Sequence, residues 1–212
     1  MISDWNFWLS IVTVAVALIA LWQTHKQIKL SNKQQLFERR LNAFTIADGL
    51  YELCLENKIV FVDIAQGKPN FANDLNFIWL TNNSFMERQA HSIKHPLEAP
   101  YHADFLRKRE ELRNLAKEIL FIFKGDEAKA YSGFVSAYEE VLFKMYQYEI
   151  VLNQMRKLNE AQPQTIEELQ GQVSEEEHRK ELNNALAKLK QSYQRIDDKN
   201  DKDKLIRQIR LK

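Results

Sequence analysis

The chain has 212 residues, of which 45% are hydrophobic and 28% are charged, and its formal net charge is +1. This composition supports a packed core and excludes a wholly disordered chain. The near-neutral charge argues against a protein built to coat nucleic acid, and the single cysteine, Cys54, excludes a disulfide within the chain.

The N-terminal stretch predicts a membrane-spanning helix. The twenty residues from Trp5 to Thr24 carry no formal charge, and as a helix they extend about 30 Å, the thickness of a bilayer's hydrocarbon core. Trp5, Trp8 and Trp22 lie at its two ends, where amphipathic rings prefer the interface, so we expect them to mark the membrane anchor. A cleaved signal peptide would need basic residues before the apolar run, and only Asp4 is charged there.

Small side chains recur along one face of this helix, at spacings of three and four residues: Ser10, Thr13, Ala17 and Ala20. Small residues allow two helices to approach closely in lipid. This face therefore predicts a helix–helix contact and a homo-oligomer.

The charges that flank the apolar run predict its orientation. No Lys or Arg precedes it, whereas five follow within about 20 residues: Lys26, Lys29, Lys33, Arg39 and Arg40. Basic residues stay on the cytoplasmic side of a membrane. We therefore expect a single-pass protein with its N-terminus outside and its C-terminal domain in the cytoplasm.

The helix is expected to continue beyond the lipid. No Gly or Pro occurs before Gly49. Apolar residues recur every seven positions, as in a helix that packs one face on its neighbours: Leu30, Phe37, Phe44 and Tyr51. The expected rod comprises an anchor, residues 1–24, and a helical stalk, residues 25–48, and it ends at Gly49.

The following residues, 49–163, predict an all-α bundle. Three segments carry apolar side chains at helical spacing and are separated by Gly and Pro: residues 74–95, 103–125 and 126–162. The aromatic and Met stripe of the last segment, from Tyr131 to Leu152, is typical of the inner face of a bundle.

Residues 164–212 predict a charged C-terminal helix followed by a basic tail. Ser174 and Glu177 have the spacing of a capping box. The narrow apolar stripe after them either packs at the edge of the bundle or pairs with another copy as a coiled coil. The tail alternates apolar residues with basic ones: Lys204, Arg207, Arg210 and Lys212. It either binds anionic lipid or caps the bundle or stays disordered.

The signatures of phosphate-binding loops, zinc proteases and serine hydrolases are missing, and we expect no cofactor. His91 and His95 lie four residues apart, as zinc ligands on one helix face do, with His102 and Asp104 nearby. Pro96 ends the helix directly after His95, which favours the alternative of polar residues near a surface loop. We therefore expect no metal.

Arg88 and His95 support a hypothesis of catalysis. With six residues between them, they resemble the R-x(4–6)-H signature of the HEPN ribonucleases, which are helical bundles and often dimers. The resemblance implies that His95 acts as acid or base and that Arg88 stabilises phosphate charge. Gln89 departs from the pattern, which more usually has a small polar residue there.

The sequence "QTHKQIKLSNKQQLFERRLNAF", residues 23–44, resembles a pattern in small membrane proteins of Gram-positive bacteria. Those proteins combine an N-terminal span, a K-Q-I-x-L-S-N-K-Q-x-L-F-x-x-R-L run and a helical cytoplasmic region. The resemblance brings no assigned activity, but some such proteins accompany phage-defence genes. It implies a bacterial plasma membrane as the location.

These patterns predict a membrane-anchored cytoplasmic interaction or effector module that acts by oligomerising or by recruiting a partner. The expected partners are the lipid bilayer, a second copy of the chain and an unidentified protein, but not nucleic acid. A membrane-tethered HEPN-like ribonuclease that uses Arg88 and His95 is the alternative.

Overall fold

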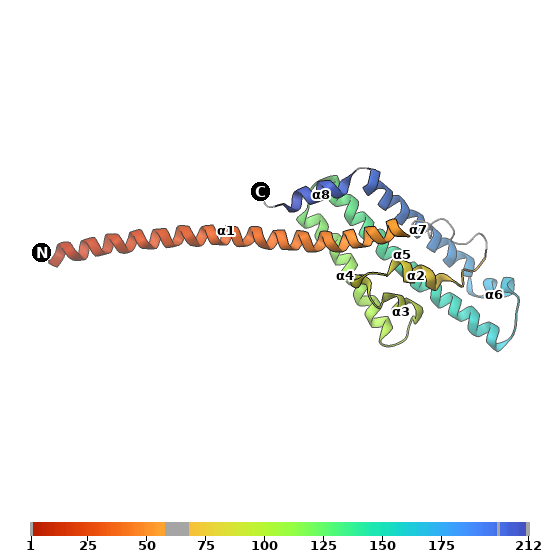
Figure 1. Cartoon of the computed structure of the whole chain (residues 1–212). Helices are drawn as coiled ribbons and strands as arrows, with labels where there is room; N and C mark the ends of the chain where they lie inside the picture. The colour runs from red at the N-terminus through yellow and green to blue at the C-terminus, as the bar shows by residue number, and fades with distance from the viewer. Residues whose placement is uncertain (1, 58–67, 199, 211–212) are drawn as a thin grey trace.

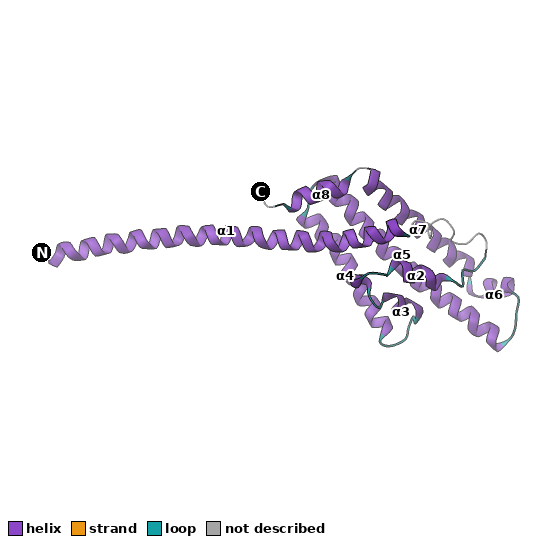
Figure 2. Ribbon diagram, viewed as in Figure 1, coloured by secondary structure: helices purple, strands orange, loops and turns teal. Residues whose placement is uncertain are grey.

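The computed structural model describes residues 2–57, 68–198 and 200–210, with the backbone alone at residues 2–4 and 6. Within these ranges every regular element is a helix (Figure 2). The predicted all-α fold is therefore confirmed.

The first helix, α1, runs without a break over 55 residues, Ile2–Glu56, and is roughly 80 Å long. Its N-terminal part extends alone from the bundle, while its C-terminal part lies against other helices (Figure 1). The continuous rod is confirmed, but Gly49 does not end it. Leu50, Leu53 and Cys54 are buried in the core, and burying them outweighs the cost of about 1 kcal/mol for a glycine inside a helix.

The segment expected to be one helix from residue 74 to 95 forms three short pieces: α2 (Asn73–Leu80), the 3-10 turn η2 (Ser84–Met86) and α3 (Gln89–Lys94). Side chains in this segment bond to the backbone. The Thr81 hydroxyl donates to the carbonyl of Phe77, and the Asn83 carboxamide oxygen accepts from the N–H of Met86 at 2.9 Å. Such bonds offer the backbone an alternative to helix, which explains the interruptions.

Two long helices form the centre of the bundle: α4 (Tyr101–Ile122) and α5 (Gly125–Ala161). The helix expected to end at Gly125 ends earlier. Gly125 instead begins α5 with a φ of 86°, a conformation that glycine adopts at little cost. The predicted inner face of α5 is confirmed, since its large side chains are buried: Tyr131, Phe134, Tyr138, Leu142, Met145 and Leu152.

Three helices complete the chain: α6 (Ile166–Val173), α7 (Glu175–Asp198) and α8 (Asp201–Ile209). The capping box expected at Ser174 and Glu177 is wrong. The box is formed one helix earlier by Thr165 and Glu168, whose two hydrogen bonds measure 3.3 and 3.0 Å. Ser174 has a φ of 53° and ends α6 instead.

The C-terminal helices share the core of the bundle. α7 lies along α5 and buries its apolar stripe: Leu182, Leu186, Leu189, Tyr193 and Ile196. Of the two alternatives for this stripe, packing at the edge of the bundle or pairing with another copy, the structure shows packing within the chain. α8 buries Leu205 and Ile209 in the same core, so the described part of the tail caps the bundle. The core therefore extends across residue 163, which the sequence placed at the boundary between the bundle and the C-terminal helix.

Candidate functional site

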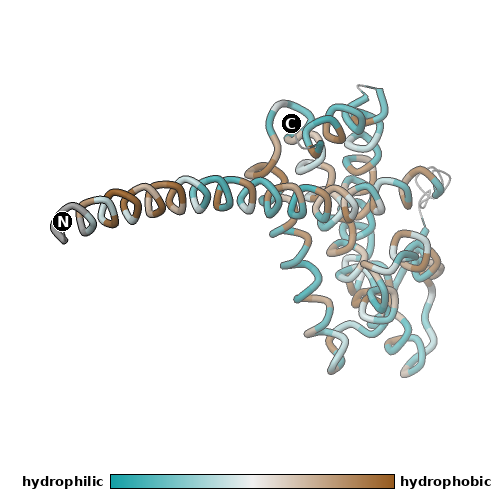
Figure 3. The backbone as a smooth tube through the Cα atoms, turned by 60° about the vertical axis from the view of Figure 1, so that its left-hand side comes forward, coloured by the Kyte–Doolittle hydropathy of each residue, from teal (hydrophilic) through white to brown (hydrophobic). Residues whose placement is uncertain are grey.

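The N-terminal part of α1 exposes a continuous apolar surface. Its large hydrophobic side chains from Trp5 to Trp22 are between 43% and 69% exposed. No part of its most apolar stretch is buried against the rest of the chain, and Figure 3 shows this hydrophobic stretch giving way to a hydrophilic one along the same helix. By length and composition, α1 is able to cross a membrane.

The three tryptophans expected to mark the anchor lie on α1. Trp8 packs edge-on against Phe7, with ring centroids 6.1 Å apart. At the other end of the apolar stretch, the ammonium of Lys26 lies 5.3 Å from the ring of Trp22. An aromatic ring next to a long basic side chain is typical of a membrane interface.

The small residues Ser10, Thr13, Ala17 and Ala20 are all exposed on α1. The Thr13 hydroxyl donates to the carbonyl of Leu9 at 2.8 Å, and the hydroxyl of Thr24 donates in the same way to Ala20. These hydroxyls are satisfied inside the helix, so the polar atoms do not oppose burial in lipid.

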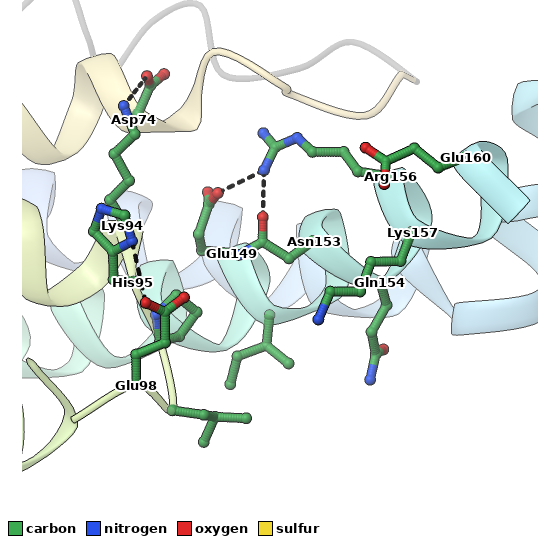
Figure 4. Close-up of a pocket in the computed structure, with 13 residues that line it drawn as sticks. Asp74, Lys94, His95, Glu98, Glu149, Asn153, Gln154, Arg156, Lys157 and Glu160 are labelled. Atoms are coloured by element: carbon green, nitrogen blue, oxygen red, sulfur yellow. Dashed lines mark hydrogen bonds and ion pairs between the residues drawn. The ribbon is translucent and has the colours of Figure 1, made fainter.

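A pocket of about 750 Å³ lies in the bundle, lined by residues of α2, the end of α3, the loop after α3, and α5 (Figure 4). Several of its charged side chains pair with one another. Lys94 lies 3.8 Å from Asp74, and His95 lies 3.6 Å from Glu98. The mixture of both signs gives the pocket no net preference for an anion or a cation.

Glu149 forms the buried wall of this pocket. Its side chain is 3% exposed. One carboxylate oxygen accepts from the guanidinium of Arg156 at 2.8 Å, and within the described chain the other oxygen has no hydrogen-bond partner. Burial raises the pKa of the Glu149 carboxyl, although the hydrogen bond and charge of Arg156 act in the opposite direction. Such a carboxyl can hold a proton above the usual pH range of glutamate.

Sequence reasoning missed Glu149, although a signal was present. The glutamate continues the three- and four-residue spacing of the buried stripe that includes Met145 and Leu152. A charged residue in the middle of a core stripe predicts a buried ionisable group.

The structure places Arg88 and His95 at opposite ends of the short helix α3. Arg88 precedes the helix, is exposed and has a φ of 71°. His95 follows the helix, and its ring stacks on Tyr101 with centroids 5.1 Å apart. His95 lines the 750 Å³ pocket, whereas Arg88 is not among its lining residues. Their catalytic role stays a prediction.

Two further residues of the metal hypothesis have other contacts. The Nδ1 atom of His102 lies 2.7 Å from the hydroxyl of Tyr146, and Asp104 lies 3.7 Å from Arg107. In the described ranges, no three His, Cys, Asp or Glu side chains are grouped as a metal site requires.

Comparisons with protein-family models, curated proteins and solved structures find no match to this chain.

Proposed function

We propose that the chain is a membrane-anchored interaction or effector module, with α1 spanning a bacterial plasma membrane and the bundle in the cytoplasm. One observation carries the proposal: a single helix has an exposed apolar surface at one end and is part of the core at the other. A surface of this kind is stable in lipid and unfavourable in water.

The continuity of α1 would fix the height of the bundle above the membrane. From Thr24 to Lys33, the first residue of α1 that lines a pocket together with α8, the helix rises about 14 Å. A stiff connection of this length would hold the bundle clear of the headgroups. A second copy or a partner would then meet it at a defined distance from the lipid.

Oligomerisation is supported by the small residues of α1. The test replaces Ala17 by Leu, which would fill the close contact between two spans, and uses Ala15→Leu as the control on the opposite face. Sedimentation of the full chain in mild detergent measures the oligomer. We expect A17L to shift the oligomer toward monomer and A15L to leave it unchanged. Equal behaviour of the two variants would rule out the proposed contact.

Recruitment of a partner is supported by an apolar stripe in and before α2. Its side chains are exposed and recur at helical spacing: Phe71, Leu75, Ile78 and Trp79. Stripes with this spacing are typical of helices that dock into the groove of another protein.

A role in phage defence is tested by expression in a Gram-positive host. Plaque numbers for a panel of phages are compared between cells with the full chain and cells with a chain that lacks residues 1–24. We expect protection only by the anchored chain. Equal plaque numbers in both strains and in cells without the chain would end this part of the proposal.

The ribonuclease alternative is tested with purified full chain and a structured RNA. We expect no cleavage that depends on Arg88 or His95. The contrary result is cleavage that disappears in both R88A and H95A, while circular dichroism shows an unchanged fold and R107A stays active. It would show that the chain is a ribonuclease rather than an interaction module.

A further inference from the structure

A second pocket, of about 570 Å³, is lined by residues of α1, α8 and the joint between α4 and α5. α8 lies beside α1 (Figure 1). Five cationic residues line it, and none of the described lining residues is acidic: Lys33, Arg40, Lys124, Arg207 and Arg210. They come from three parts of the chain that are far apart in sequence. The fold therefore brings together basic residues that are separate in the sequence.

Hydrogen bonds hold the walls of this pocket together. The guanidinium of Arg40 donates to the carbonyls of Ile122 and Gln208, both at 2.7 Å. The Gln208 carboxamide accepts from the N–H of Lys124 at 2.9 Å and donates to its carbonyl at 2.9 Å. Arg40 uses two of its five N–H donors in this way, so three remain for a ligand. The site is organised before anything binds.

The positive charge of Arg40, Lys124, Arg207 and Arg210 exceeds the negative charge that the described chain places beside it. Glu127 accepts a hydrogen bond from Gln208 at 2.7 Å, and Glu118 pairs with Arg39 outside the pocket at 3.3 Å. The C-terminal ends of α4 and α8 each act as about half a negative charge, which together offset about one of the cations. Even without Lys33, an excess of positive charge remains on the other four cations of the pocket.

We propose that this pocket binds a phosphate group, carried either by a soluble molecule or by a lipid headgroup. Guanidinium groups match phosphate oxygens with paired N–H donors, and lysines add charge. Leu36, Phe37 and Ile209 supply an apolar wall beside the cations. The pocket therefore suits a phosphate attached to a larger, partly apolar molecule.

The position of the pocket on α1 favours a soluble molecule; this choice of source, but not the site itself, rests on the proposed anchor. Lys33 and Arg40 are about 14 and 24 Å beyond Thr24 along the helix. Headgroups extend only about 5 to 8 Å beyond the hydrocarbon core. With α1 upright, the pocket lies above the headgroup layer.

The test uses the full chain in phosphatidylcholine nanodiscs, with inorganic pyrophosphate as the probe and calorimetry as the measurement. We expect binding that R207Q/R210Q weakens by about tenfold or more. K190Q/R195Q, a matched pair on α7, should leave it unchanged. If R207Q/R210Q loses helix content by circular dichroism, K124Q replaces it, because the hydrogen bonds described for Lys124 involve only its backbone.

A second arm separates the two sources by thermal unfolding without pyrophosphate. A soluble source predicts the same midpoint in discs with and without phosphatidylglycerol. A headgroup source predicts a higher midpoint with phosphatidylglycerol, and R207Q/R210Q should abolish the increase. Pyrophosphate binding that is equal in both double variants overturns the site. So does the absence of binding together with an unchanged midpoint. Neither result depends on the orientation of α1 in a cell.

Discussion

The guanidinium of Arg40 on α1 donates a 2.7 Å hydrogen bond to the backbone carbonyl of Gln208, 168 positions later in the chain. A second bond of the same length reaches the carbonyl of Ile122. Both carbonyls lie in the last turn of a helix, where they have no partner within that helix. One side chain of α1 thus satisfies one terminal carbonyl of α4 and one of α8, and attaches both helices to α1.

Replacing Arg40 by Gln should destabilise the bundle by about 2 to 3 kcal/mol, because charged hydrogen bonds to half-buried carbonyls are lost. The measurement is urea unfolding of the full chain in mild detergent, followed by circular dichroism. Arg39 is the matched control, since it is 71% exposed and pairs with Glu118. R39Q should cost less than about 0.5 kcal/mol. Equal effects of R40Q and R39Q would show that Arg40 does not attach the helices.

Lys202 makes a second attachment between α8 and α1, with its ammonium 2.8 Å from both Asp48 and Glu52. Lys202→Met should destabilise the α8 contact by about 1 to 2 kcal/mol, because two carboxylates lose their cation. Hydrogen exchange of the α8 amides measures the effect. Lys188→Met, which breaks a more exposed pair with Glu140, is the control. Unchanged exchange in α8 would contradict this role.

The same attachment predicts a pH dependence. Burial lowers the pKa of the Lys202 ammonium, but the hydrogen bonds and charges of Asp48 and Glu52 outweigh it and raise the pKa above 10.5. A cation whose pKa is raised by folding stabilises the folded state fully below its unfolded pKa. This stabilisation should therefore be present below pH 10.5 and be lost as the pH rises further. K202M should lose less stability over this range, and the loss that remains comes from groups such as Tyr51, whose pKa burial raises to about 12. Urea unfolding at a series of pH values measures both chains.

Removing residues 1–24 should yield a soluble and mostly helical protein. The side chains described between Trp5 and Thr24 are all exposed and contribute nothing to the core. Circular dichroism and size-exclusion chromatography measure the product. A disordered or aggregated product would mean that the apolar end of α1 is needed for folding.

The sequence predicts the long elements well and the short ones poorly. α1 and α5 extend through many turns, so their periodic apolar residues predict a helix even where a single residue, such as Gly49, disfavours one. Between Asn73 and Lys94, single hydrogen bonds from Thr81 and Asn83 decide where each piece ends. Such local competition has no periodic signal.

The basic pocket could not be predicted from the sequence, because its residues belong to other sequence patterns. Lys33 belongs to the charges expected to orient the proposed span, and Arg207 and Arg210 belong to the amphipathic tail. Only the packing of α8 beside α1 brings them together. A site formed by long-range packing requires the fold before its residues can be grouped.

The most direct test of the proposed membrane orientation is thiol labelling in intact cells. Native Cys54 cannot report the side on which it lies, because it is fully buried and burial raises its pKa well above the usual value of a thiol. Single cysteines are therefore placed at Ile2 and at the exposed Gln191 in a Cys54→Ala chain. The account predicts that a membrane-impermeant maleimide labels position 2 in intact cells and position 191 only after lysis. Labelling of position 191 in intact cells, with position 2 protected until lysis, would contradict it.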